Sequence, residues 1–216
     1  MAKEQKKSSL HETNRYEDAA FPVGMYEVTR EGIVPEGRGY LDLHWHEELQ
    51  FTLVDRGTLN LQVNAVDYTL KEGQGIFINR NLLHVTNELS RDGRYFSLNF
   101  PDKMLGFFPG SRMEQDDVIP YTGNYAFPAV VLRREVPWQR EILEDLTQVF
   151  GLLAGREESR EYQVAMKLTA MWHRLICHSK GQLVALSKGE VRYQERIRKM
   201  LSFIHEHYEK EIHLED

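Results

Sequence analysis

Polar and apolar residues alternate along the stretch from Gly39 to Val54. From Asp42 onward, one parity carries Asp42, His44, His46, Glu48, Gln50 and Thr52, and the other carries Leu43, Trp45, Leu49, Phe51 and Leu53. A period of two is that of an extended strand whose two faces differ in chemistry. Two histidines and a glutamine on one face favour a concave site for a polar ligand or a metal ion. A strand with one face in water would show the same alternation.

Further short strands are expected on both sides of this stretch. One begins within residues 21–26, and others cover about 59–63, 66–70, 76–78, 84–86 and 94–100, with turns such as Asp55-Arg56-Gly57 between them. Many short strands separated by glycine-rich turns are typical of a β-sandwich or a small barrel. We therefore expect a barrel over residues 21–134.

Apolar residues recur at helical spacing after residue 135. Pro137 fits the first position of one helix, and a second helix is expected from about Ser159 to His178. Two helices joined by a short polar loop form an antiparallel hairpin, here over residues 135–180. Both apolar stripes are wide, so the hairpin either packs entirely on the barrel or keeps area for a partner subunit. We expect a homodimer through this hairpin, with Leu146 and Leu153 on the exposed stripe.

The two ends of the chain differ from the barrel and the hairpin. Residues 1–20 are polar and highly charged without periodicity, as is typical of a flexible N-terminal arm. Residues 181–190 are expected to form a linker, and a further C-terminal helix is expected from about Val191. The apolar face of that helix has nothing after it to pack against, so residues 191–216 are expected to be the truncated start of another domain.

Composition and charge restrict the class of function. The 216 residues carry a formal net charge of −6, which disfavours strong nucleic-acid binding by this chain, because such binding rests mostly on neutralising phosphates. A single cysteine, Cys177, excludes an intramolecular disulfide and suits the cytoplasm. No apolar run reaches the length of a membrane span, and the N-terminus lacks the apolar stretch of a secretory signal. We expect a cytoplasmic protein that does not bind a membrane.

The spacing of glycines and histidines resembles the two cupin motifs. Gly39, His44, His46, position 50 and Gly57 follow the first motif, and Gly75 and His84 stand where the second motif has its glycine and its third histidine. The resemblance implies an α+β fold, with a cupin-like double-stranded β-barrel followed by the helical hairpin and the C-terminal helix. This sequence departs from the motifs in the Gly39 spacing, in Gln50 where the metal-binding glutamate would stand, and in Asn79 and Asn81.

The order of barrel, hairpin and C-terminal helix resembles the AraC/XylS family of transcription regulators. In that family a helix of the form Ile…Ile-x-x-x-Tyr, here Ile197…Ile204-x-x-x-Tyr208, opens the DNA-binding half. A segment Ile-Ser/Thr-Leu-Glu-Asp then begins the first helix-turn-helix, and here His213 replaces the Ser or Thr. The resemblance implies an effector-binding and dimerisation half with only the start of the DNA-binding half.

Two functions are compatible with these residues. The first is transcription regulation without enzyme activity or cofactor: the barrel binds a small polar metabolite, such as a sugar, and controls DNA binding by a C-terminal domain. The ligand-binding side chains would be His44, His46, Glu48, Gln50, His84, Tyr95 and Asn99. The alternative is a cupin metalloenzyme, an oxygenase or isomerase, with His44, His46 and His84 as metal ligands. The neutral Gln50 favours the regulator.

Overall fold

The computed structural model describes residues 10–14 and 16–182, together with 196–197, 199–200, 203–204 and 207. Of the linker expected over residues 181–190, residues 181–182 are described and the rest lie outside the described residues. The C-terminal helix expected from Val191 also lies outside them, except for the seven positions from 196 to 207. None of the described helices combines the length and the apolar composition that crossing a membrane requires.

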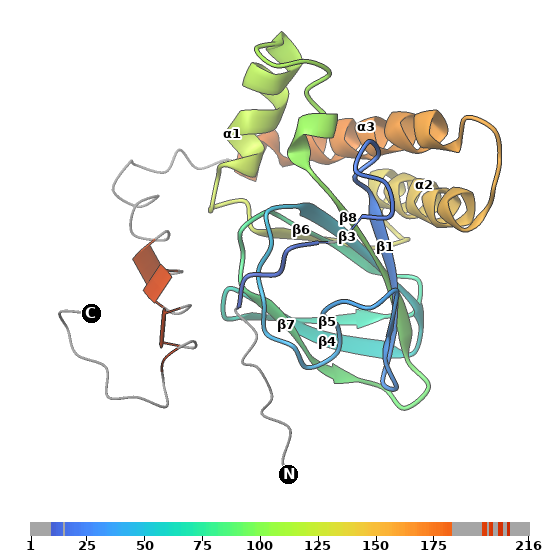
Figure 1. Ribbon diagram of the computed structural model, residues 1–216, viewed down its shortest axis with the longest axis vertical. Coiled ribbons are helices and arrows are strands. Elements are labelled where there is room, and N and C mark those ends of the chain that lie inside the picture. The colour runs from blue at the N-terminus through green and yellow to red at the C-terminus, as the bar shows by residue number, and fades with distance from the viewer. Residues whose placement is uncertain are drawn as a thin grey trace.

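The described strands form two sheets that face each other as the walls of a barrel (Figure 1). One sheet has the order β2-β1-β8-β3-β6-β9 and the other has the order β5-β4-β7. The strands are β1 (Gly24–Thr29), β2 (Ile33–Val34), β3 (Leu49–Arg56), β4 (Thr58–Val63), β5 (Val66–Lys71), β6 (Gly75–Ile78), β7 (His84–Leu89), β8 (Arg94–Phe100) and β9 (Ala129–Leu132). The expected α+β fold with a cupin-like barrel is confirmed.

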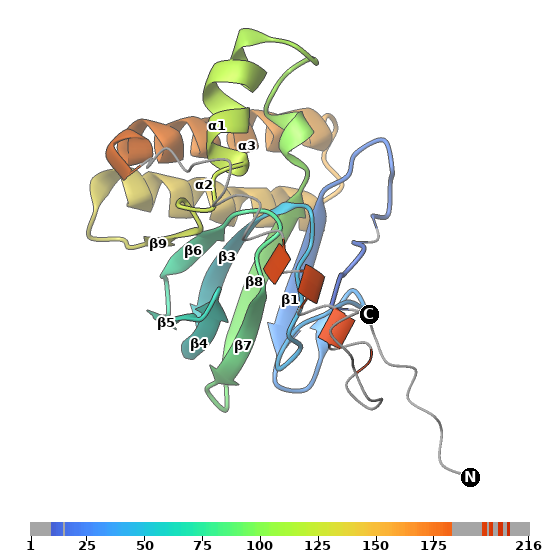
Figure 2. The same ribbon diagram turned by 90° about the vertical axis from the view of Figure 1, so that its left-hand side faces the viewer.

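A helical hairpin covers the outer face of the larger sheet. It consists of α2 (Pro137–Ala154) and α3 (Arg160–Ser179), which lie side by side over that sheet (Figures 1 and 2). The sequence did not indicate the elements between β8 and α2: the short helix η1 (Asp102–Met104), the π-helix η2 (Met113–Val118), α1 (Ile119–Thr122) and the edge strand β9. A short helix, η3 (Lys180–Gln182), follows α3.

Strand β3 is buried on both faces, and the two faces meet different surroundings. This difference explains why polar and apolar residues alternate along the strand. Leu49, Phe51 and Leu53 belong to the core between the sheet and the hairpin, whereas Gln50 and Thr52 on the other parity line the barrel cavity. A second core of aliphatic and aromatic side chains fills the rest of the barrel interior. The sheet therefore separates an apolar layer beneath the helices from a mixed polar interior.

The strand expected from Asp42 is interrupted in the structure. Strand β3 begins only at Leu49, and residues 39–48 pair through single bridges, His44 with His84 on one side and Trp45 with His11 on the other. Leu41 also has a positive φ of 68°, which an extended strand does not allow. The segment divides its backbone hydrogen bonds between β7 and the N-terminal residues, so no continuous ladder forms.

Two other expectations are wrong in the described residues. Leu146 is fully buried in the core beneath the hairpin, and Leu153 packs against the same core, so neither lies on an exposed stripe. The expected flexible arm, residues 1–20, is packed on the barrel around Leu10 to Asn14: Leu10 and Asn14 are buried, and the backbones of Leu10 and Glu12 bond to Trp45. Both errors concern contacts between residues far apart in the sequence.

Candidate functional site in the barrel

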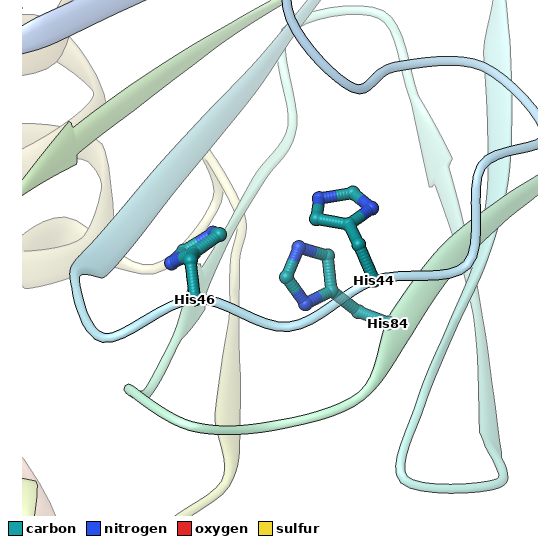
Figure 3. Close-up of side chains that lie close together, drawn as sticks. All are labelled: His44, His46 and His84. Atoms are coloured by element: carbon teal, nitrogen blue, oxygen red, sulfur yellow. The ribbon is translucent and has the colours of Figure 1, made fainter. Parts of the chain in front are cut away.

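Three imidazole rings converge inside the barrel (Figure 3). The backbones of His44 and His84 face each other in an antiparallel bridge, and their ring centroids lie 4.2 Å apart. The ring of His46 lies 5.0 Å from that of His84 and 5.9 Å from that of His44. One nitrogen of each ring lies within 4.8 Å of the other two, and all three residues are buried.

Backbone carbonyls fix the orientation of two of these rings. Nδ1 of His44 donates to the carbonyl of Asp42 at 2.6 Å, and Nδ1 of His84 donates to that of Leu82 at 2.9 Å. In the neutral form, each Nε2 therefore carries a lone pair. Nε2 of His84 has no hydrogen-bond partner among the described residues, and Nε2 of His44 lies 3.4 Å from a carboxylate oxygen of Glu12.

Burial keeps the histidines neutral. Desolvation lowers the pKa of His44 to about 3, with a further contribution from neighbouring His46. Desolvation, followed by the two other imidazoles, lowers the pKa of His84 well below its ordinary value. The pKa of His46 is lowered as well, again mainly by desolvation. Near neutral pH the lone pairs on Nε2 of His44 and His84 are available to a hydrogen-bond donor or a metal ion.

A cavity of about 30 Å³ lies beside the rings. A buried water needs roughly 10–15 Å³ of such space, so the cavity has room for about two or three waters. Its polar lining includes five of the seven residues expected from the sequence, namely His44, Gln50, His84, Tyr95 and Asn99, together with Glu12, Thr52, Thr86 and Ser97. The register explains this grouping: Gln50 lies opposite Asn99 and Thr52 opposite Ser97 in the β3–β8 pair.

His46 and Glu48 do not line this cavity, contrary to expectation. The nitrogens of His46 face Oε1 of Gln50 at 3.0 Å and the carbonyl of Glu48 at 3.2 Å. The Glu48 carboxylate accepts hydrogen bonds from Asn14 at 2.7 Å and from Tyr16 at 2.6 Å. Both residues thus face protein groups already: the N-terminal segment in the case of Glu48, and Gln50 with the Glu48 carbonyl in the case of His46.

The N-terminal segment, of which residues 10–14 and 16 are described, was missed as part of the site. Asn14 is its central residue: its Oδ1 accepts from the Tyr26 hydroxyl at 2.9 Å and from Nδ2 of Asn99 at 3.1 Å, and its Nδ2 donates to Glu48. Glu12 lines the cavity, and desolvation raises the pKa of its carboxyl. No periodicity in residues 1–20 could have indicated these contacts.

Thr52 and Ser97 were also missed, although their parity could have indicated them. The hydroxyls lie 3.0 Å apart, and Nε2 of Gln50 donates to Thr52 at 2.8 Å. Thr52 shares the parity of Gln50, and Ser97 shares that of Asn99. A polar chain therefore runs from His46 through Gln50 and Thr52 to Ser97.

Sequence comparison places this barrel in a family. Residues 35–168 match the model of the AraC-like ligand binding domain. The chain belongs to the AraC-like regulators. It is 30% identical over 209 residues to the HTH-type transcriptional regulator YdeC of Bacillus subtilis (strain 168). The match covers 96% of this chain and 69% of that protein.

Solved structures of AraC-like regulators resemble the fold more distantly. ToxT from Vibrio cholerae strain SCE256, bound to an unsaturated fatty acid, matches with a TM-score of 0.45 and 11% identity, over 89% of this chain and 76% of that chain. The AraC-like transcriptional activator CuxR matches with a TM-score of 0.36 and 12% identity, over 84% and 67% of the two chains. Both TM-scores are low, so the family assignment rests on the sequence matches.

The histidines of this AraC-like barrel also fit a metal ion. Three neutral imidazoles are suitable ligands for zinc or iron, and the unpartnered Nε2 of His84 is an acceptor that a cation would satisfy. Nε2 of His44 would be the second ligand. His46 would have to exchange its contact with Gln50 for the metal, and Gln50 would contribute at most a neutral amide oxygen.

Proposed function

We propose that this AraC-like domain binds a small hydroxyl-bearing metabolite, such as a sugar, inside the barrel and thereby controls DNA binding in the cytoplasm. The DNA-binding activity would belong to a helix-turn-helix domain like that named for the Bacillus subtilis relative. The domain would catalyse no reaction and would act as a homodimer.

The observation that carries this proposal is a surplus of acceptors around the cavity. Nε2 of His84 and Oδ1 of Asn99 are buried without a partner among the described residues. Nε2 of neutral His44 faces the Glu12 carboxylate, so two acceptors approach each other there. Leaving a buried polar atom unpaired costs about 1–3 kcal/mol. A ligand with several hydroxyl donors would satisfy these atoms together.

The size of the cavity adds a condition to the proposal. Ligand pockets usually enclose about 300–1,000 Å³, roughly ten to thirty times the volume of about 30 Å³ between the sheets. Glu12 forms part of the lining, and Asn14 ties the same segment to Asn99 and Tyr26. Outward movement of residues 10–16 would widen the cavity without disturbing the sheets. The metabolite would therefore replace this segment at the mouth of the barrel.

The test is a titration with a panel of monosaccharides and polyols, in which binding is measured by calorimetry and by the rise in melting temperature. For a compound that binds, His84→Ala should weaken affinity by roughly five- to thirtyfold, the equivalent of one lost hydrogen bond. His173→Ala, which removes an exposed histidine of α3, is the matched control and should leave affinity unchanged. Equal affinities in the unmutated chain and the His84 variant would contradict the proposal.

A metalloenzyme is the second candidate, favoured by three buried imidazoles that each place one nitrogen within 4.8 Å of the other two. His44, His46 and His84 would hold the ion, which would supply Lewis-acid or redox chemistry when bound. Metal analysis of the purified chain separates the candidates. Stoichiometric metal, lost in His84→Ala together with a catalytic turnover, would establish this candidate in place of the first.

A further inference from the structure

A second, larger cavity lies outside the barrel. It is an open cavity of about 320 Å³ between the loop that follows β6 and the region of α1, which lies above the end of that strand in Figure 1. Its lining includes Asn79, Arg80, Asn81, Asp102, Thr122 and Tyr125, none of which lines the barrel cavity. The volume falls within the range of about 300–1,000 Å³ that is usual for small-molecule sites.

Arg80, one of the residues that line this cavity, has an unused donor. Its Nη1 forms an ion pair with Asp102, whereas its Nε is buried and has no hydrogen-bond acceptor among the described residues. The guanidinium edge formed by Nε and Nη2 is not the one that meets Asp102. This edge presents two parallel N–H groups, which match the two oxygens of a carboxylate.

The wall that carries Arg80 is held in place by hydrogen bonds. Nδ2 of Asn79 donates to the carbonyls of Tyr121 at 2.8 Å and Phe127 at 2.9 Å, and Oδ1 of Asn79 accepts from the backbone N–H of Arg80 at 2.9 Å. The backbone N–H of Asn81 donates to the carbonyl of His46 at 2.8 Å. The cavity is therefore formed before any ligand arrives.

We propose that this outer cavity is a second binding site, for a small organic acid. The Nε edge of Arg80 would hold the carboxylate, and Leu82, Ile119 and Tyr125 would contact the apolar part of the molecule. Asp102 would keep the guanidinium oriented through its pair with Nη1. The site is independent of the metabolite site proposed for the barrel.

Benzoate is a suitable probe, because it joins a carboxylate to a small apolar ring. The titration follows the ¹H–¹⁵N signals of the arginine Nε–H groups in the ¹⁵N-labelled chain. We expect saturable binding, with a dissociation constant on the order of millimolar, and a shift of the Arg80 Nε–H signal. Benzamide, which has a single acceptor oxygen and no charge, should bind about tenfold more weakly.

Variants decide whether Arg80 is responsible. Arg80→Lys keeps the charge but loses the two-pronged edge, and Arg80→Gln loses both; binding should weaken by about tenfold or more in each. Arg133→Gln removes an exposed arginine outside the cavity and should bind benzoate normally. The proposal is overturned by non-saturable shifts, or by unchanged binding in Arg80→Lys when that variant is folded.

Discussion

The buried histidines link the stability of the barrel to pH. His44, His46 and His84 are neutral when folded but take up protons near their ordinary pKa of 6.5 when unfolded. Because the folded pKa values are lowered, their contribution to stability is complete above pH 6.5 and is lost as the pH falls below that value. Glu12 acts in the opposite direction: its raised pKa contributes stability that is lost as pH rises above about 4.5.

The free energy of unfolding should therefore decrease between about pH 7 and about pH 5, with up to about 1.4 kcal/mol per pH unit from each histidine. Urea unfolding at several pH values measures this slope. His84→Gln removes one of the buried titrating groups, so its slope should be smaller. His173→Gln on the exposed face of α3 should keep the original slope. A slope that is equal in all three chains would contradict this account of the cluster.

At the scale of elements, the N-terminal segment is part of the barrel rather than an appendage. Asn14 joins this segment to Tyr26 of β1, to Asn99 of β8 and to Glu48. Asn14→Ala would leave these buried or half-buried groups without their partner. We expect it to lower the free energy of unfolding by about 1–3 kcal/mol, measured by urea unfolding.

The matched control for this variant is Asn60→Ala, which removes an amide from the exposed hydrogen bonds of β4. It should change stability by less than about 0.5 kcal/mol. Hydrogen exchange of residues 10–16 should also become faster in Asn14→Ala. If the two variants have the same stability, the segment is not anchored by Asn14.

The helical hairpin retains exposed apolar residues, though not Leu146 and Leu153, the two leucines that were expected on its exposed stripe. On α3, Tyr162 is 71% exposed and Met166 is 54% exposed, and a spacing of four puts them on one helical face. We predict that two copies of the chain pair through this face. Met166→Lys should convert the dimer into a monomer in sedimentation at tens of micromolar, roughly the weakest affinity useful to a functional pair.

Val66→Lys provides the comparison for this dimer test. Val66 is 51% exposed at the start of β5, away from the hairpin, so the same added charge there should leave the dimer intact. A monomer in the unmutated chain would contradict the prediction. Dissociation of both variants would indicate a nonspecific effect of charge.

For the whole molecule, charge is the property that governs contact with DNA. The chain carries a formal net charge of −6, and its family match is to a ligand-binding domain. We predict that residues 1–216 alone show no sequence-selective DNA binding at physiological salt, because few phosphates can be neutralised. Fluorescence anisotropy with labelled duplexes measures this. Selective binding with an affinity in the nanomolar range would contradict the prediction.

Local patterns in the sequence determined much of the fold and part of the site. Alternation predicted most of the strands, and helical spacing predicted the start of α2 at Pro137 and both ends of α3 to within one residue. Parity also brought Gln50 and Asn99 to the cavity. These predictions succeed because side-chain direction along a strand or helix is set by the backbone of that element alone.

Only the tertiary structure decided which of these strand and helix faces are covered by other segments of the chain. The segment around Asn14 has no pattern of its own, because its conformation comes from partners up to 85 residues away. The apolar stripe that includes Leu146 was expected to be free for a partner subunit, but in the structure it packs against the larger sheet. His46 has the correct parity, yet its two ring nitrogens face Oε1 of Gln50 and the Glu48 carbonyl instead of the cavity. A sequence pattern specifies the direction of a side chain, whereas the neighbour that it meets depends on how distant segments pack.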